Sequence, residues 1–341
     1  MKRAGSPDCC LLHVFLLTYN RQKSLRRTLE AIAASSLKDH PLTVMDNCST
    51  DETGAVCEEY RKALPQMEVV RHERNIGFGA NYLRALERSE GEYTWVLCDD
   101  DTLYPERVGA LLELLREQRP EACFVGGPRQ EEWPAGLNVL PSEIQRKCGT
   151  FTTGPSFVPA LVFKSGLIGS RELLGGYFAI RTNYPQMEIG RKLLVEDIPC
   201  AVLRPPVLTR DEPTEKGATP LEVIVGWSFY CRTLPAKLRK EGFYSVFGRP
   251  TMTGMVREVL RMVVWTKIDG GSTPSYDLAL IGLNTGWEVR IGLTVCRLAC
   301  LVPGRVYHVA RECYRKVKYG WLGRPLPPTY HVPVGQDELR R

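Results

Sequence analysis

Four apolar segments near the start of the chain each run into a polar cluster and then into a helix-like segment. The apolar segments are 11–17, 42–45, 68–70 and 93–98, and the helical patterns cover 24–34, 52–62, 81–88 and 105–118. Strands that are joined by helical crossovers lie parallel, with right-handed connections. This rhythm therefore predicts an α/β fold in which helices flank a mostly parallel sheet.

The polar clusters directly follow the strands, so they belong to one edge of the predicted sheet. They cover residues 18–21, 46–51, 75–79 and 99–101. Ligands of open parallel sheets bind beyond the carboxyl ends of the strands. Capping of turns and helices alone would need fewer polar residues, so the sequence predicts a ligand site at this edge.

Three consecutive aspartates, Asp99, Asp100 and Asp101, end the fourth apolar segment. Adjacent carboxylates repel one another unless a positive group lies among them. One acid would be enough to cap the helix that starts near Pro105. Hard divalent cations prefer oxygen ligands of this kind. The triplet therefore favours a metal site over a solvated acidic turn.

The cluster after the second strand contains residues of two kinds, some with a structural role and some that are candidates for ligand contact. Ser49 and Glu52 have the spacing of a capping box, so we interpret Ser49 and Asp51 as structural. Asp46 and Asn47 are the candidates for ligand contact, because a carboxylate at a strand end can accept a hydrogen bond from a pyrimidine ring edge. A local turn is the alternative for Asp46.

After about residue 125 the strand and helix rhythm is lost. Residues 126–155 suggest loops, 158–163 a strand, 184–194 a helix and 201–208 an edge strand with a Pro pair. From about residue 219 the pattern is mainly helical, with candidates at 255–266, 290–300 and 306–318. We therefore expect a catalytic domain over 1–215, with halves at about 10–125 and 126–215, and a helical region over 216–341.

Composition sets wider limits. The net charge of +6 permits contact with phosphates or anionic lipid, and the lack of aromatic-basic interleaving makes nucleic acid an unlikely partner. Twelve cysteines without a CxxC pair argue against structural zinc. The start does not read as a signal peptide, and no stretch reaches about 18 apolar residues. We expect a cytoplasmic chain with reduced thiols.

Taken together, the segments 18–21, 46–51, 74–81 and 99–101 resemble glycosyltransferase family 2, whose members are inverting enzymes with the GT-A fold. The resemblance covers about residues 10–125, and the rest is similar, more weakly, to bacterial enzymes that build cell-surface polysaccharides. It implies transfer of a hexosyl or pentosyl group from a nucleotide-diphosphate sugar, with a UDP-sugar as the default. The acceptor would be a hydroxyl of a glycan or a lipid-linked glycan.

The resemblance also implies roles for matching positions. Asp99 and Asp101 would correspond to the outer acids of the family's DXD motif and hold Mn²⁺ or Mg²⁺. The donor would lie along Thr18, Tyr19, Asn20, Arg21, Asp46, Asn47, Asn75, Gly77, Asn81, Asp99 and Asp100. An acid of the second half would be the general base, and both Glu188 and Asp197 are candidates, with a narrow preference for Glu188.

Two other features remain open. Trp133 would stack on a sugar or pack internally. The C-terminal helix candidates carry basic residues that would either rest on an anionic membrane surface or pack against the catalytic domain; these are Arg257, Arg261, Arg311, Arg315, Lys316 and Lys318. The alternatives to a glycosyltransferase are a nucleotidyltransferase of sugar phosphates and a non-catalytic protein that binds sugar nucleotides.

Overall fold

The computed structural model describes residues 10–127, 129–180, 184–210, 220–236, 238–239, 243, 252–268, 278–279, 281–282, 287–303, 305–307, 309–310 and 313. The chain forms two compact units, Met1–Glu215 and Lys216–Arg341. The roles assigned to these two parts stay predictions.

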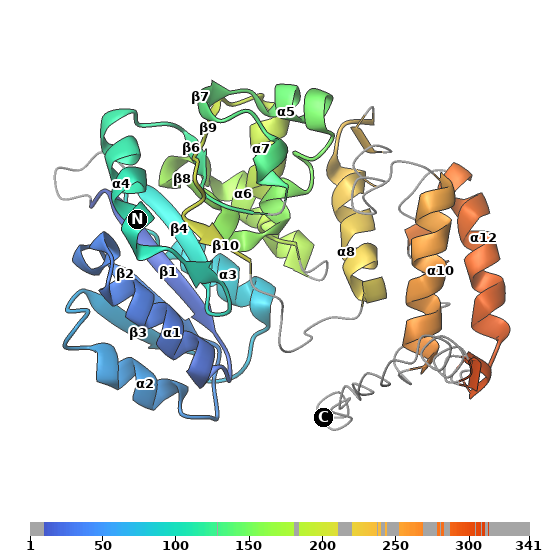
Figure 1. The fold of residues 1–341 in the computed structure, drawn as a ribbon, viewed down its shortest axis with the longest axis horizontal. Coiled ribbons are helices and arrows are strands. Elements are labelled where there is room, and N and C mark those ends of the chain that lie inside the picture. The colour runs from blue at the N-terminus through green and yellow to red at the C-terminus, as the bar shows by residue number, and fades with distance from the viewer. Residues whose placement is uncertain are drawn as a thin grey trace, which may run out of the picture. The chain divides into compact units, whose positions relative to one another are not determined.

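The first half of unit 1 alternates strands and helices as the sequence predicts. Its elements are β1 (Leu12–Thr18), α1 (Gln22–Ala33), η1 (Ser36–Asp39), β2 (Leu42–Asp46), α2 (Thr53–Tyr60), β3 (Met67–Arg71), α3 (Phe78–Glu87), β4 (Tyr93–Cys98), β5 (Thr102–Leu103), η2 (Pro105–Arg107) and α4 (Val108–Glu117). Every residue of β1 is buried, as expected for a central strand of a sheet that is covered on both faces. In Figure 1, β1 to β4 are neighbouring strands, and α1 lies next to α2.

The second half consists of shorter elements, and four of its strands extend the same sheet. They are β6 (Ala122–Phe124), η3 (Gln130–Glu132), β7 (Gly136–Val139), α5 (Pro141–Cys148), η4 (Gly154–Ser156), η5 (Val158–Ala160), β8 (Leu161–Lys164), η6 (Ser165–Leu167), α6 (Ser170–Ala179), α7 (Met187–Val195), β9 (Cys200–Val202) and β10 (Leu208–Thr209). Unit 2 contains α8 (Pro220–Thr233), α10 (Met252–Ile268) and α12 (Trp287–Leu301).

The main sheet has eight strands in the order β3-β2-β1-β4-β8-β6-β9-β7. The β3, β2, β1 and β4 strands pair in parallel, β8 is antiparallel to β4 and β6, β9 is parallel to β6, and β7 is antiparallel to β9. The α/β class and the mostly parallel sheet are therefore confirmed. Because β8 is antiparallel to both β4 and β6, and β9 is parallel to β6, the strands β6 and β9 point the same way as β4.

Two predictions about the second half are wrong. The segment 126–155 contains β7 and helix α5 in addition to loops. Pro141 in the first turn and Gly149 just after the end, with φ of 68°, are ordinary helix boundary signals. The expected edge strand is also misplaced, because β9 ends at Val202 and lies between β6 and β7. The chain then turns through the cis peptide Arg204-Pro205 before β10.

Candidate active site

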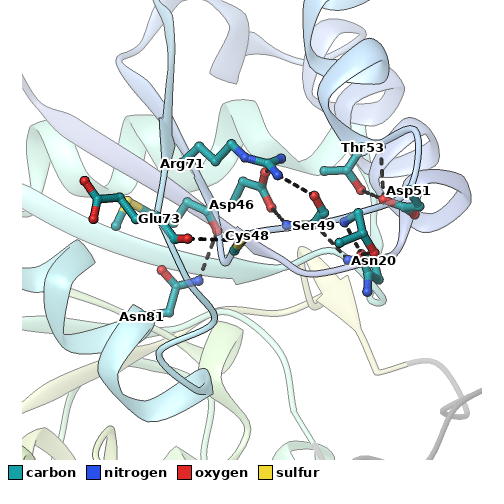
Figure 2. A network of polar contacts seen from close by, with 11 residues as sticks. Asn20, Asp46, Cys48, Ser49, Asp51, Thr53, Arg71, Glu73 and Asn81 are labelled. Atoms are coloured by element: carbon teal, nitrogen blue, oxygen red, sulfur yellow. Dashed lines mark hydrogen bonds and ion pairs between the residues drawn. The ribbon is translucent and has the colours of Figure 1, made fainter. Parts of the chain in front are cut away.

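Asp46 and Arg71 form an ion pair where the ends of β2 and β3 meet. The two residues are direct partners in the parallel ladder. Asp46 Oδ2 accepts from Arg71 Nη1 at 2.8 Å, and Asp46 Oδ1 accepts from the Ser49 backbone N–H at 2.9 Å. Figure 2 shows Arg71 reaching over Asp46 to the Ser49 carbonyl, 2.6 Å away. Asp46 is buried and both of its oxygens accept hydrogen bonds, whereas half of the Arg71 side chain is exposed, so the pair presents guanidinium donors at the sheet edge.

The sequence alone did not single out Arg71. It lies at the end of a short strand in a segment with several charged residues, and only its register opposite Asp46 distinguishes it. The predicted strand ends at residue 70, and β3 in the structure extends one residue further, to Arg71.

Asn47 is turned toward the next loop of the chain. Its Nδ2 donates to Asn75 Oδ1 at 2.7 Å, and its Oδ1 accepts from the Ile76 N–H at 2.9 Å. Asn75 Oδ1 also accepts from the Gly77 N–H at 2.8 Å. Gly77 has φ of 82°, a conformation that favours glycine. We therefore correct the interpretation of Asn47: this buried amide holds the loop before α3, and its polar atoms are used within the chain.

Asn81 differs from its predicted role in the same way. This buried side chain donates to the Met45 carbonyl at 3.0 Å, and its Oδ1 lies 2.9 Å from His72 Nε2. Figure 2 shows Asn81 reaching from α3 to the backbone of β2. Its contacts tie the helix to the sheet, so we no longer expect it to contact the donor.

Asn20 joins the loops after β1 and β2. Its backbone has φ of 52°. Its N–H donates to Ser49 Oγ at 2.9 Å, and its Oδ1 accepts from the Thr50 N–H at 2.7 Å. Tyr19, the preceding residue, is half-buried. The loop after β1 is therefore fixed against the loop that follows Asp46, as predicted for clusters on one edge.

Asp51 caps the helices on both sides of this junction. Its Oδ2 accepts from the Gln22 N–H at 3.1 Å, and its Oδ1 accepts from the Thr53 N–H at 3.1 Å. The structural interpretation of Asp51 is confirmed. The predicted capping box is not formed, because the Glu52 side chain makes no capping hydrogen bond and the Ser49 hydroxyl accepts from the Asn20 N–H.

Asp99 points into the protein. Its Oδ2 accepts from Thr18 Oγ1 at 2.6 Å, and its Oδ1 accepts from Arg21 Nη1 at 3.2 Å. Burial raises the pKa of Asp99 to about 6, against the opposing effects of Thr18 and Arg21. Arg21 Nη1 also donates to Asp100 Oδ2 at 2.6 Å. A guanidinium is thus the positive group that lies between the first two acids.

A different set of side chains could hold a metal ion. One ligand atom each from Cys98, Asp100 and Asp101 lies within 4.8 Å of the others. Burial raises the pKa of the Cys98 thiol, so this soft ligand stays protonated, and the two carboxylates are the groups that fit a hard cation. Asp101 belongs to this group, and its role as a metal ligand stays a prediction. Asp99 does not belong to it, because Thr18 and Arg21 hold its oxygens.

The end of unit 1 returns to this acidic turn. The short strands β5 and β10 pair antiparallel, with Thr209 opposite Thr102, the residue after Asp101. Arg210 follows at once. A cavity of about 510 Å³ lies beside it, lined by Gly127, Gln130, Glu131, Leu203, Arg204, Pro205, Pro206, Leu208, Thr209 and Arg210. No local pattern in the sequence predicts this pairing, because the two strands are only two residues long.

Asp197 lies on the opposite edge of the sheet from the aspartate triplet. It precedes β9, which points the same way as β4, whereas the triplet follows β4. Its carboxylate accepts from the Ser142 N–H at 2.9 Å and from the Ser142 hydroxyl at 2.7 Å, at the start of α5. This position suits a helix cap and does not suit a base for chemistry at the triplet.

Glu188 lies in the first turn of α7. That helix leads into β9 through a short turn, so its start lies toward the edge at which β9 ends. The carboxylate is buried beside Gly175, where a Cβ would come within 2.7 Å of Oε2, and it accepts from Arg191 Nε at 2.9 Å. Gln186 is also buried. Its Nε2 donates to the Ser156 carbonyl, and within the described ranges its Oε1 has no hydrogen-bond partner.

Trp133 is a packing residue. It is buried against Phe124 and Phe151, and its Nε1 donates to Thr150 Oγ1 at 2.7 Å. A Cβ on Gly154 would lie 2.2 Å from the indole ring. This tight enclosure leaves no room for a sugar on the ring.

Solved structures show the same arrangement of elements. S. aureus TarS in complex with UDP-GlcNAc matches with a TM-score of 0.54 at 16% identity, over 85% of this chain and 91% of that one. The mannosyltransferase PcManGT from Pyrobaculum calidifontis, in complex with GDP-Man and Mn²⁺, matches with a TM-score of 0.53 at 15% identity, over 87% of each chain. The fold is therefore GT-A, the fold of these glycosyltransferases.

The sequence comparisons narrow the class to a family. Residues 13–174 match the family model described as Glycosyl transferase family 2, and this part of the chain is a glycosyltransferase family 2 domain. The putative teichuronic acid biosynthesis glycosyltransferase TuaG of Bacillus subtilis is 28% identical over 116 residues, which are 34% of this chain and 46% of that protein. The chain spans less than half of the length of this and further curated relatives.

Proposed function

We propose that the protein transfers a hexosyl or pentosyl group from a UDP-sugar to a hydroxyl of a glycan or lipid-linked glycan, with inversion and with help from Mn²⁺ or Mg²⁺. The observation that carries this proposal is that Asp46 with Arg71, and Asp100 with Asp101, follow the carboxyl ends of parallel strands at one edge of the sheet. The first pair would hold the base and the second the diphosphate.

The first pair complements the ring edge that uracil and thymine share, and UDP is chosen between the two because it is the default that the family resemblance implies. The ring edge of uracil has an N–H donor between two carbonyl acceptors. A buried carboxylate with an adjacent guanidinium complements that edge, because Asp46 accepts while Arg71 donates. Arg71 has further N–H groups beyond those that contact Asp46 and Ser49. Asp46 would share an oxygen between Arg71 and the base.

The groups proposed to bind the diphosphate are the acids Asp100 and Asp101, through a metal ion, and the guanidinium of Arg210. A divalent cation bound by Asp100 and Asp101 would stabilise the negative charge that grows on the leaving diphosphate. Arg210 follows the strand that pairs beside Thr102, and its positive charge suits the same diphosphate. Arg21 would keep Asp99 and Asp100 in place.

Glu188 is the proposed general base. Inversion needs a carboxylate that takes the proton from the acceptor hydroxyl on the face opposite the leaving group. Of the two candidates, Glu188 is at the helix end that lies toward the correct edge of the sheet. The unpaired, buried Oε1 of Gln186, two residues earlier, supports an acceptor hydroxyl there, because a buried amide oxygen without a donor is costly.

A thermal-shift screen tests the donor. UDP and UDP-sugars with Mn²⁺ should raise the melting temperature more than GDP or CDP, since ligands stabilise the state that binds them. Turnover assays with the stabilising sugar nucleotide then follow, with Asp101→Ala as the inactive control. Stabilisation by nucleoside triphosphates with sugar phosphates would indicate a nucleotidyltransferase. Tight UDP binding without transfer or hydrolysis would indicate a non-catalytic binding protein.

A further inference from the structure

A cavity lies in unit 2, and the charged side chains that line it are both arginines. It has a volume of about 430 Å³ and is lined by Ala279, Gly282, Arg290, Ile291, Thr294 and Arg297. Arg290 and Arg297 are seven residues apart on α12, with Thr294 between them, so all three project from one side of the helix. The Thr294 hydroxyl donates to the Arg290 carbonyl at 3.0 Å, so the two guanidinium groups beside this hollow are the donors that suit a phosphate.

The arginines have little else to bind. Arg290 Nε donates to the Gly282 carbonyl at 2.6 Å, which holds its stem across the cavity. Arg297 Nη2 would lie 3.5 Å from a Cβ on Gly282, so this guanidinium lies beside the same residue. Within the described ranges neither arginine forms an ion pair. In contrast, Arg257 and Arg261 of α10 both lie beside the Glu258 carboxylate, at 3.4 and 3.7 Å.

An exposed apolar stripe borders the cavity. Ile291, Val295 and Leu298 follow the helical spacing, and their exposed fractions are 57%, 52% and 62%. The opposite side of α12, with Leu293 and Cys296, is fully buried and packs on α10, which is next to α12 in Figure 1. The helix therefore has two apolar faces, and contacts with the described residues cover only one of them.

The charge of the whole chain is concentrated in this unit. Residues 216–341 contain 19 Lys and Arg against 9 Asp and Glu, a net charge of +10, whereas residues 1–215 carry a net charge of −4. A free phosphate would account for the two arginines but not for the neighbouring apolar stripe. A lipid accounts for both, because its phosphate and its hydrocarbon are adjacent.

We propose that α12 is a membrane-docking surface, on which Arg290 and Arg297 bind the phosphate of an anionic lipid and Ile291, Val295 and Leu298 enter the interface. This inference does not depend on the proposed sugar transfer. None of the helices in the described ranges is long and apolar enough to span a membrane. The surface would attach the protein to one leaflet.

Vesicle flotation of the full chain tests the proposal. We expect binding to vesicles of phosphatidylcholine with phosphatidylglycerol and none to phosphatidylcholine alone. Arg290→Gln with Arg297→Gln should weaken binding about thirtyfold, given the contribution of each basic residue near an anionic surface. The matched control, Arg257→Gln with Arg261→Gln, changes the charge equally on α10 and should weaken binding less than threefold. Melting curves of both variants check folding.

A second pair of measurements separates the sources of phosphate. Val295→Ser with Leu298→Ser should also weaken flotation, since these exposed side chains would leave the interface. Inorganic phosphate alone should produce no shift in melting temperature at millimolar concentration. Failure to float, equal losses in the two arginine variants, or a phosphate shift that needs Arg290 and Arg297 but no vesicles would each overturn the proposal. Dimerisation that Leu298→Ser abolishes would assign the stripe to a second copy.

Discussion

Asp46 Oδ2 lies 2.8 Å from Arg71 Nη1, and this contact joins the ends of two strands that are 25 residues apart in the chain. The carboxylate is buried, so the guanidinium neutralises a charge that would be costly alone. The exposed half of Arg71 presents donors at the sheet edge beside this carboxylate. A single contact thus serves both the stability of the sheet edge and the proposed recognition of the base.

The first prediction concerns this pair. We expect Arg71→Gln to weaken UDP binding about tenfold to a hundredfold, because a hydrogen bond to a charged group is lost. Isothermal titration with UDP and Mn²⁺ measures the dissociation constant. Arg61→Gln on α2, which removes an exposed arginine paired with Glu58, serves as the control and should change binding less than twofold. Equal affinity in wild type and Arg71→Gln would contradict the base assignment.

The second prediction separates the three aspartates. Asp101→Asn and Asp100→Asn should each abolish the Mn²⁺ dependence of UDP binding, because their carboxylates belong to the metal group. Asp99→Asn should keep the Mn²⁺ affinity within a few-fold, since Thr18 and Arg21 hold its carboxylate inside the protein. Mn²⁺ titrations followed by electron paramagnetic resonance measure this difference. Loss of Mn²⁺ binding in Asp99→Asn alone would reverse the assignment.

The third prediction concerns the base. Glu188→Gln should lower kcat by about a hundredfold or more, the usual contribution of a positioned base, while the affinity for the UDP-sugar stays unchanged. The amide can still accept from Arg191, so folding should be preserved. Transfer assays together with donor titrations make the comparison. A fall in donor affinity without a fall in kcat would assign Glu188 to donor binding.

A companion variant probes the second candidate acid. Asp197→Ala should lower the free energy of unfolding by about 1 kcal/mol, because α5 loses its capping carboxylate. Its kcat should remain near that of the wild type. Chemical denaturation and transfer assays give the two quantities, and a large loss of kcat with an unchanged unfolding transition would restore Asp197 as the base.

The fourth prediction concerns pH. Burial lowers the pKa of His13 from 6.5 to about 4, while its Nε2 is 3.0 Å from Thr43 Oγ1. The unfolded chain therefore binds a proton at higher pH than the folded chain, so the stabilising effect is complete above pH 6.5 and is lost as the pH falls toward 4. The loss should approach about 3 kcal/mol.

Denaturation curves at pH 7 and pH 5 for wild type and His13→Gln measure this effect. The difference between the two proteins isolates His13, because Asp99, whose raised pKa acts in the opposite direction, is present in both. An identical pH dependence in both proteins would show that His13 is not the titrating group.

The local pattern of the sequence was sufficient for the first half of the fold. Strand and helix periodicities depend on neighbouring residues, and parallel strands with crossovers follow from their order. For this reason β4 has the predicted bounds, Tyr93–Cys98, and β2 differs by one residue. The position of Asp46 and the aspartate triplet at one edge follows from the same order.

The tertiary structure alone decided which polar side chains remain for a ligand. Asn47 and Asn81 form hydrogen bonds with backbone groups of a loop and a strand, and Asp99 accepts a hydrogen bond from Arg21. Buried polar groups need such partners, and here the partners are distant in sequence. Arg71 and Arg210 come to the site through strand register, which no local pattern records. The sequence by itself determined which edge of the sheet carries the polar clusters, and long-range pairing determined which of their side-chain atoms remain for a ligand.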